Sequence, residues 1–276
     1  MPELPEVTVV INELKKTSII NQRIKSVNVF LPKVIKNTTV DKFKKFFVNE
    51  FIKNITRKGK YLIFELTHNK WWVVHLRMEG KLFYQTPNEQ RINRFLMAQL
   101  IFSNGRELNY YDTRMFGTFH IYLGEEINKS KELNKLAIDP LDKNFTGQYL
   151  FNRINNINRA IKTVLLDQTV VSGIGNIYAD EILFYGKINP LRVAKNISLN
   201  QCKLIAKGSK LIFNEAIKYN GTTIDSFMVN ASHVGNYQDK LKVHNRNNHP
   251  CPICGTLIKM IKINGRGTYY CPHCQK

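Results

Sequence analysis

Two Cys-x-x-Cys pairs near the C-terminus constrain the fold of this chain more than any other feature. Sixteen residues separate the pairs, which consist of Cys251, Cys254, Cys271 and Cys274. This spacing predicts a zinc site in which a β-hairpin joins two tight turns and four thiolates bind one metal. Four thiolates complete a tetrahedron without a water ligand, so we expect the zinc to be structural. Two redox pairs or unliganded thiols are the alternative, and His249 and His273 are competing ligands.

The charge of the chain favours a polyanionic partner. Lys and Arg number 41 against 21 Asp and Glu, which gives a formal charge of +20 over 276 residues. Nucleic acid is the commonest partner of such a protein, although a generally basic composition has the same effect. The positive charges are spread along the chain and interleaved with aromatic residues, as at 42–47, whereas a membrane-surface helix would cluster them.

Composition excludes several other classes. Hydrophobic residues make up 43%, too many for a mostly disordered chain. No apolar run is long enough to cross a bilayer, and the acidic start with Pro2 and Pro5 does not resemble a secretory signal. The few cysteines do not suggest a disulfide scaffold. We therefore expect a monomer in a reducing cytoplasm.

The chain divides into three predicted domains, 1–135, 136–239 and 240–276. The first combines an apolar-periodic helix with runs of β-branched and aromatic residues, and Asn104-Gly105 suits a tight hairpin turn. We predict an α+β protein that begins with a β-sandwich flanked by helices. The expected helix lies at 7–20, and the expected strands lie at 60–66, 71–76, 95–103, 106–111 and 116–123.

The second domain is predicted to be helical, with helices at 160–167, at 177–185 and from Ser198 to Tyr219. Between the first two helices lies Gly-Ile-Gly-Asn at 173–176. It lacks the third glycine and the preceding strand of a dinucleotide fingerprint. A glycine turn before a helix can bind phosphate through backbone N–H groups, with Asn176 as a further donor. A simple helix-capping turn is the alternative. Cys202 is expected to be buried and inert.

The third domain adds an arginine at the tip of the predicted hairpin. Gly265 and Gly267 flank Arg266, so a phosphate can approach the guanidinium closely. An ordinary solvated turn arginine has the same local sequence.

The N-terminus can provide an unusual nucleophile. Removal of Met1 would leave Pro2 with a free secondary amine, whose pKa near 8 leaves a useful fraction neutral and nucleophilic. Attack of this amine on a sugar carbon can give a Schiff base, and Glu3 and Glu6 supply carboxylates for proton transfer. The alternative is a stiffened helix start with acidic residues favoured by the helix dipole.

Several motifs along nearly the whole chain resemble the bacterial formamidopyrimidine-DNA glycosylases. They are Met-Pro-Glu-Leu-Pro-Glu-Val at 1–7, Arg-Lys-Gly-Lys-Tyr-Leu at 57–62, Gly-Ile-Gly-Asn-Ile-Tyr-Ala-Asp-Glu at 173–181, Gly-Thr-Thr at 221–223 and the cysteine hairpin. The resemblance implies a helix–two-turns–helix element in the second domain. It also implies a bifunctional repair enzyme that excises 8-oxoguanine and formamidopyrimidines from duplex DNA and then nicks the abasic site.

The resemblance assigns roles by position. Pro2 would be the nucleophile, Glu3 the acid that opens the sugar, and Lys60 a phosphate ligand that assists proton transfer. Arg266 would clamp a phosphate together with Asn176 and assist the second elimination. The other residues expected at the DNA are Glu6 in the base pocket, Met78, Arg114 and Phe116 in the space left by the flipped base, Arg94 and Lys162. Residues 221–238 correspond to the loop that covers the lesion.

The chain departs from the family pattern at three places. Met115 stands where a second basic residue is common, and residues 94–97 replace a Lys-His-x-His run, so a phosphate-contacting histidine is missing and Arg94 is its candidate substitute. The usual Tyr-Gly-Arg before the finger is His-Asn-Arg at 244–246.

Two other functions compete with this one. An endonuclease VIII-like enzyme that acts on oxidised pyrimidines shares the proline, the glutamate and the finger, but Leu4, Arg114 and Phe116 argue against it. A non-catalytic protein that binds damaged DNA would have the basic surface and the finger, but it would not need Pro2, Glu3 and Lys60 together.

Overall fold

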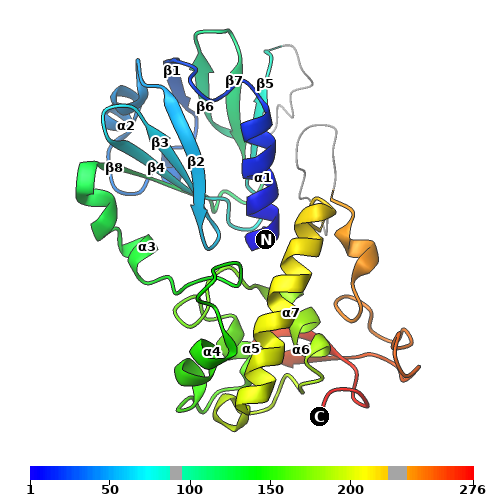
Figure 1. The fold of residues 1–276 in the computed structure, drawn as a ribbon. Helices are drawn as coiled ribbons and strands as arrows, with labels where there is room; N and C mark the ends of the chain where they lie inside the picture. The colour runs from blue at the N-terminus through cyan, green and yellow to red at the C-terminus, as the bar shows by residue number, and fades with distance from the viewer. Residues whose placement is uncertain (88–94, 223–234) are drawn as a thin grey trace. The chain divides into compact units, whose positions relative to one another are not determined.

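The computed structural model describes residues 1–87, 95–222 and 235–276 (Figure 1). The chain forms two compact units. Unit 1 comprises Met1–Asn134 and Asn220–Asn236, and unit 2 comprises Lys135–Tyr219 and Tyr237–Lys276. None of the helices in these described ranges is long and apolar enough to span a membrane.

Unit 1 contains two four-stranded antiparallel sheets, which confirms the predicted α+β class. One sheet has the order β1-β6-β7-β5 and the other the order β2-β3-β4-β8. Aromatic rings fill the space between the sheets: Tyr110 of β7 packs on Phe119 of β8 at 4.8 Å, and Phe119 contacts Trp72 of β4. The strands are β1 (Ile24–Val29), β2 (Ile52–Lys58), β3 (Tyr61–Leu66), β4 (Lys70–His75), β5 (Lys81–Gln85), β6 (Leu96–Phe102), β7 (Glu107–Tyr111) and β8 (Thr118–Leu123).

The first helix, α1 (Leu4–Lys16), begins three residues before the predicted start and ends earlier than predicted. The earlier start has a local cause, because Glu3 and Glu6 form a reciprocal capping box and Pro5 occupies the first turn. At the other end, the backbone N–H of Thr17 donates to the carbonyl of Leu14 and closes the helix. Proline and glutamate thus act as a helix start signal here.

The basic and aromatic run at 42–47 has a structural explanation. It lies in α2 (Val40–Phe47), capped by the Thr39 side chain, and its charges and rings alternate with helical period. Phe43 and Phe47 are fully buried and stack against the aromatic core, whereas the lysines face solvent. This segment is an amphipathic core helix, so the interleaving by itself does not indicate nucleic-acid binding. Shorter helices of unit 1 are η1 (Pro32–Val34), η2 (Gly124–Lys129) and α3 (Lys131–Asn134).

Unit 2 packs helices against the C-terminal hairpin. The long helix α7 (Leu199–Lys218) begins, as predicted, at Ser198, which forms a capping box with Gln201. Cys202 is buried on this helix, and burial raises the pKa of its thiol to about 11, which disfavours the nucleophilic thiolate. The remaining elements are α4 (Gly147–Ile154), α5 (Ile161–Leu165), α6 (Asn176–Tyr185), η3 (Ala194–Asn196), η4 (Tyr237–Lys240), β9 (Lys259–Ile263) and β10 (Arg266–Tyr270).

Candidate functional site

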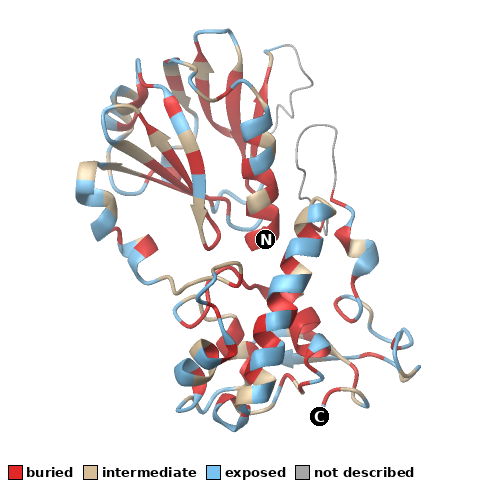
Figure 2. Ribbon diagram, viewed as in Figure 1, coloured by how far each residue is buried: buried red, intermediate tan, exposed pale blue. Residues whose placement is uncertain are grey.

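The start of α1 is organised around the carboxylate of Glu6. Its Oε2 accepts a hydrogen bond from the backbone N–H of Glu3 at 2.9 Å, and its Oε1 accepts from the N–H and hydroxyl of Thr222 at 2.9 and 3.1 Å. Much of the inner side of α1 is buried (Figure 2), and Pro2, Glu3 and Glu6 are all buried. One carboxylate therefore joins the beginning of the chain to the segment that follows α7.

Gly221 makes this approach possible. Its φ is +75°, and a Cβ atom there would lie 2.9 Å from Oε1 of Glu6. Any side chain would thus be strained and would press on the carboxylate. The glycine in the Gly-Thr-Thr motif is explained by this contact within unit 1. The segment 223–234, most of the loop expected to cover a lesion, lies outside the described residues, as does Arg94.

Lys60 lies in the two-residue turn between β2 and β3, beside Gly59 with its φ of +56°. It is buried, which is unusual for a lysine at a hairpin tip. The hairpin is tied to α1, since Nε of Arg57 donates to the hydroxyl of Thr8 at 2.9 Å. The sequence motif at 57–62 therefore contacts the helix in which the N-terminal motif ends.

His75 at the end of β4 is a buried neutral imidazole near this hairpin. Burial lowers its pKa well below the usual value, and the charges of Arg77, Lys60 and His120 lower it further. Its Nδ1 accepts the backbone N–H of Arg77 at 2.9 Å, and its ring packs edge-on against Tyr61. The positive charges of Arg77 and Lys60 around His75 also favour the approach of an anion.

Met78, Arg114 and Phe116 form an exposed group on two turns of unit 1. Met78 and Phe116 are 39% and 48% exposed, and the guanidinium of Arg114 lies 5.2 Å from the centre of the Phe116 ring. A hydrogen bond from Thr113 to Glu79 connects the two turns. Phe116 precedes β8 and is not a core residue. Apolar, aromatic and cationic side chains are thus displayed together.

The buried carboxylate of Asp112 shapes the turn that carries Arg114 and Phe116. Its Oδ2 accepts the backbone N–H groups of Phe116 and Gly117 at 2.9 and 2.7 Å, and its Oδ1 accepts that of Arg114 at 3.1 Å. Asp112 has no exposed surface. Asp112 was not among the predicted site residues, although an Asp at the end of a strand is a recognisable turn signal.

Unit 2 brings Asn176 and the hairpin tip together. Asn176 is the first residue of α6, and its Nδ2 donates to the carbonyl oxygen of Gly267 at 3.0 Å. The neighbouring Arg266 is exposed at the start of β10, where the β9–β10 hairpin turns through Asn264 and Gly265. A hydrogen bond to Gly267 therefore places Asn176 next to the residue that follows Arg266, although Arg266 lies 90 positions further along the chain.

Lys162, expected at the DNA, lies fully buried in the same network. Its Nζ contacts Oδ1 of Asp180 at 2.7 Å and donates to the Gly267 carbonyl at 2.9 Å and the Thr268 hydroxyl at 2.8 Å. The other carboxylate oxygen of Asp180 lies 2.7 Å from Nδ1 of His244. In this structure Lys162 holds the hairpin in place, and its contact with DNA remains a prediction. Asp180 and His244 were not recognised from the sequence.

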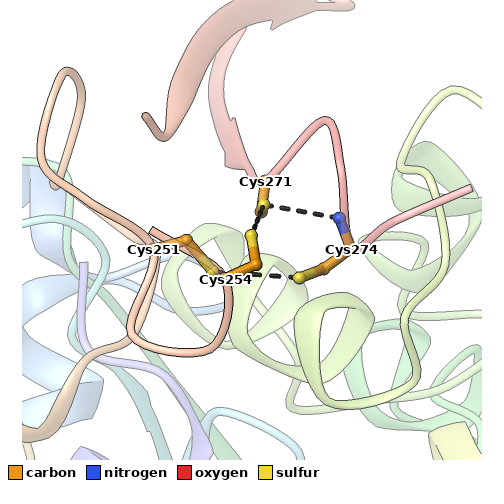
Figure 3. A group of neighbouring side chains, drawn as sticks. All are labelled: Cys251, Cys254, Cys271 and Cys274. Carbon is orange, nitrogen blue, oxygen red and sulfur yellow. Dashed lines mark hydrogen bonds between the residues drawn. The ribbon is translucent and has the colours of Figure 1, made fainter. Parts of the chain in front are cut away.

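The four cysteines converge as the spacing predicts (Figure 3). Their sulfur atoms all lie within 4.8 Å of one another, with 3.9 Å between Cys251 and Cys274 and 3.5 Å between Cys254 and Cys271. A tetrahedron with Zn–S bonds of about 2.3 Å has edges of about 3.8 Å. Backbone N–H groups of Ile253 and Cys274 also point at cysteine sulfurs, at 3.5 and 3.4 Å. The donor set thus fits a zinc ion.

Comparison with protein families matches most of the chain. Residues 1–119 match the formamidopyrimidine-DNA glycosylase N-terminal domain, residues 136–228 match the formamidopyrimidine-DNA glycosylase H2TH domain, and residues 248–276 match the zinc finger found in FPG and IleRS. The formamidopyrimidine-DNA glycosylase of Ureaplasma parvum is 49% identical and that of Mycoplasma genitalium is 47% identical. The alignments cover 100% of this chain and 100% and 96% of those proteins.

Solved structures of the Lactococcus lactis protein have the same fold. An FPG mutant in complex with DNA that contains Fapy-dG aligns with a TM-score of 0.93 at 33% identity over 100% of both chains. The complex of Lactococcus lactis Fpg with DNA that contains an abasic site gives 0.92 at 33% identity over 99% of both chains. With three matching domains and full-length relatives, this chain belongs to the formamidopyrimidine-DNA glycosylase family.

Proposed function

We propose that this protein is a base-excision repair enzyme that removes 8-oxoguanine and formamidopyrimidines from duplex DNA and then cleaves the abasic strand. The observation that carries the proposal is the buried N-terminal arrangement, in which Glu6 fixes the backbone of Glu3 beside Pro2. A protein that only binds DNA has no need to bury two carboxylates at the start of its chain, because removing a carboxylate from water costs free energy that its hydrogen bonds must offset.

The proposed chemistry begins after removal of Met1. The Pro2 nitrogen attacks C1′ of the damaged nucleotide, the glycosidic bond breaks, and the base leaves with a proton. Glu3 protonates the ring oxygen of the sugar as it opens, and the product is a Schiff base between Pro2 and C1′. Elimination at C2′ and then at C4′ releases the two flanking phosphates and cleaves the strand. Lys60 and Arg266 assist these steps by binding phosphate.

The proposed DNA contacts come from two groups of side chains. Met78 and Phe116 replace the stacking of the extruded base, and Arg114 bonds the orphaned partner base. Asn176 and Arg266 bind phosphates beside the flipped nucleotide. The formal charge of +20 adds a sequence-independent attraction to the backbone.

We expect one structural zinc in the finger, and we expect the finger to serve DNA binding and not the chemical steps. Cys254→Ser should release the zinc and weaken duplex binding, because the two Cys-x-x-Cys turns that fix both ends of the β9–β10 hairpin would separate. Metal analysis and titration of an abasic-analogue duplex measure the two effects. Cys202→Ser, which alters the remaining cysteine on α7, should leave both unchanged. Normal affinity in a zinc-free Cys254 variant would contradict this role.

Borohydride trapping tests the lesion class and the reaction together. The protein should form a covalent adduct with a duplex that contains 8-oxoguanine, because borohydride reduces the Schiff base to a stable amine. Adduct formation only with an oxidised pyrimidine would favour the endonuclease VIII-like alternative. Tight binding without an adduct on a preformed abasic site would favour the non-catalytic alternative. An undamaged duplex is the control.

A further inference from the structure

A small polar hollow lies in unit 2 beside the hairpin tip, and Arg266 is the one residue of its lining that the proposed chemistry uses. Its volume is about 220 Å³, and Arg159, Asp167 and Arg266 are among the residues that line it. The walls come from the segment around α5 and from the tip of the β9–β10 hairpin. Since both walls belong to unit 2, the hollow is defined within one compact unit.

Arg159 is held in place on one wall. Its backbone carbonyl accepts the N–H of Ala194 at 2.9 Å, and its Nη2 donates to Oδ2 of Asp167 at 2.8 Å. Asp167 is itself fixed, because its Oδ1 accepts the N–H and the hydroxyl of Thr169 at 3.1 and 2.7 Å. The Arg159 side chain is nevertheless 50% exposed. The ion pair thus orients the guanidinium and leaves part of its fork of donors open to solvent.

The charges around the hollow leave an excess of positive charge. Burial raises the pKa of Asp167, but hydrogen bonds from Thr169 and Arg159 outweigh this and lower it, so the carboxylate is ionised and balances one guanidinium. The charge of Lys162 is balanced by Asp180. Arg266 is exposed and forms no ion pair within the described ranges. Two guanidinium groups therefore face one carboxylate, and an anion is favoured.

We propose that this hollow binds a second phosphate of the DNA strand. Arg159 binds this phosphodiester, which is next to the one bound by Arg266. The proposal rests on the proposed function and extends it, because it gives the α5 wall a role in positioning the DNA strand. A planar guanidinium fork fits a phosphate well. Since a free phosphate has the same chemistry, the test separates the two sources.

Salt-dependent binding tests the phosphate contact. An abasic-analogue duplex is titrated with wild type and with Arg159→Ala between about 50 and 200 mM salt. Each lost phosphate contact reduces the steepness of the plot of log association constant against log salt concentration by about 0.9. We expect this reduction and about tenfold weaker binding, a typical loss for one charged hydrogen-bonded contact. Arg159→Lys should keep the slope and bind more weakly, because lysine retains the charge but not the fork.

Lys210→Ala is the matched control, since it removes one positive charge from an exposed position of α7 away from the hollow. A wild-type slope and affinity for Arg159→Ala would overturn the proposal. Binding of inorganic phosphate that depends on Arg159, without any effect on duplex binding, would also overturn it, because the hollow would then take free phosphate.

Borohydride trapping on a preformed abasic site separates this proposal from the proposed function. Wild type and the Lys210→Ala control should both give the adduct, because neither lacks a residue of the proposed site. If wild type itself gives no adduct, the proposed chemistry fails regardless of the salt slope. Zinc content and thermal unfolding of the variants should match wild type, which would show that the weaker binding does not come from an altered fold.

Discussion

A protein that retains Met1, or carries an N-terminal tag, is expected to lose base excision and strand cleavage together. Blocking the nucleophile should reduce both rates by about 10⁴-fold or more, because loss of a nucleophile in other enzymes has effects of at least this order. A retained Met1 converts the secondary amine of Pro2 into an amide nitrogen, which cannot form a Schiff base. Binding of an abasic-analogue duplex should change far less than either rate.

The measurement is single-turnover excision and nicking with protein whose N-terminus has been verified by mass spectrometry. Pro2→Gly with Met1 removed is the matched control, since a terminal glycine still offers an amine and should keep a trace of borohydride trapping. Undiminished activity of the extended protein would exclude Pro2 as the nucleophile and assign the Schiff base to a lysine.

Local sequence signals predicted the parts of the fold that depend on local interactions. Asn104-Gly105 marks the turn between β6 and β7, Ser198 begins α7, and the cysteine spacing predicts the metal cluster. A pattern that suits two structures decides less. The interleaved charges and rings at 42–47 fit a nucleic-acid surface and an amphipathic helix equally well, and in the structure the helical period buries Phe43 and Phe47.

Most contacts that build the site join residues far apart in the chain, so local sequence patterns do not predict them. Glu6 and Thr222 are 216 positions apart and meet because the chain returns to unit 1 after α7. Asp180 lies in a helical motif that suggests only a helix, yet it binds both Lys162 and His244 from inside unit 2. Buried polar groups need partners, but the sequence does not say which.

Arg266→Ala is expected to impair excision of a paired oxidised purine much more than cleavage of a preformed abasic site. The tip is rigid because Cys254 and Cys271 anchor the two ends of the hairpin on one sulfur cluster, and the Gly267 carbonyl is held by Asn176 and Lys162. Flipping a stacked, paired base costs a few kcal/mol, and a charged bidentate contact to phosphate can offset much of it. An abasic nucleotide has no base to unstack.

The expected loss is about 10- to 100-fold on the 8-oxoguanine duplex, which corresponds to about 1.5–3 kcal/mol for a hydrogen bond to a charged group. The loss on the abasic duplex should be several times smaller. Single-turnover rates of wild type and variant on both substrates measure the difference. Lys262→Ala is the control, because Lys262 is an exposed cation on β9 of the same hairpin and lacks the planar fork. Zinc content should be unchanged in both variants.

The ratio of the two losses identifies the step in which Arg266 acts. Equal loss on both substrates would place Arg266 in the chemistry of elimination or in general affinity. Loss on neither would make it a solvated turn residue. A selective loss would show that the hairpin acts before bond cleavage, through the phosphate backbone, and that the network of Lys162, Asp180 and Asn176 exists to hold that guanidinium at the flipped nucleotide.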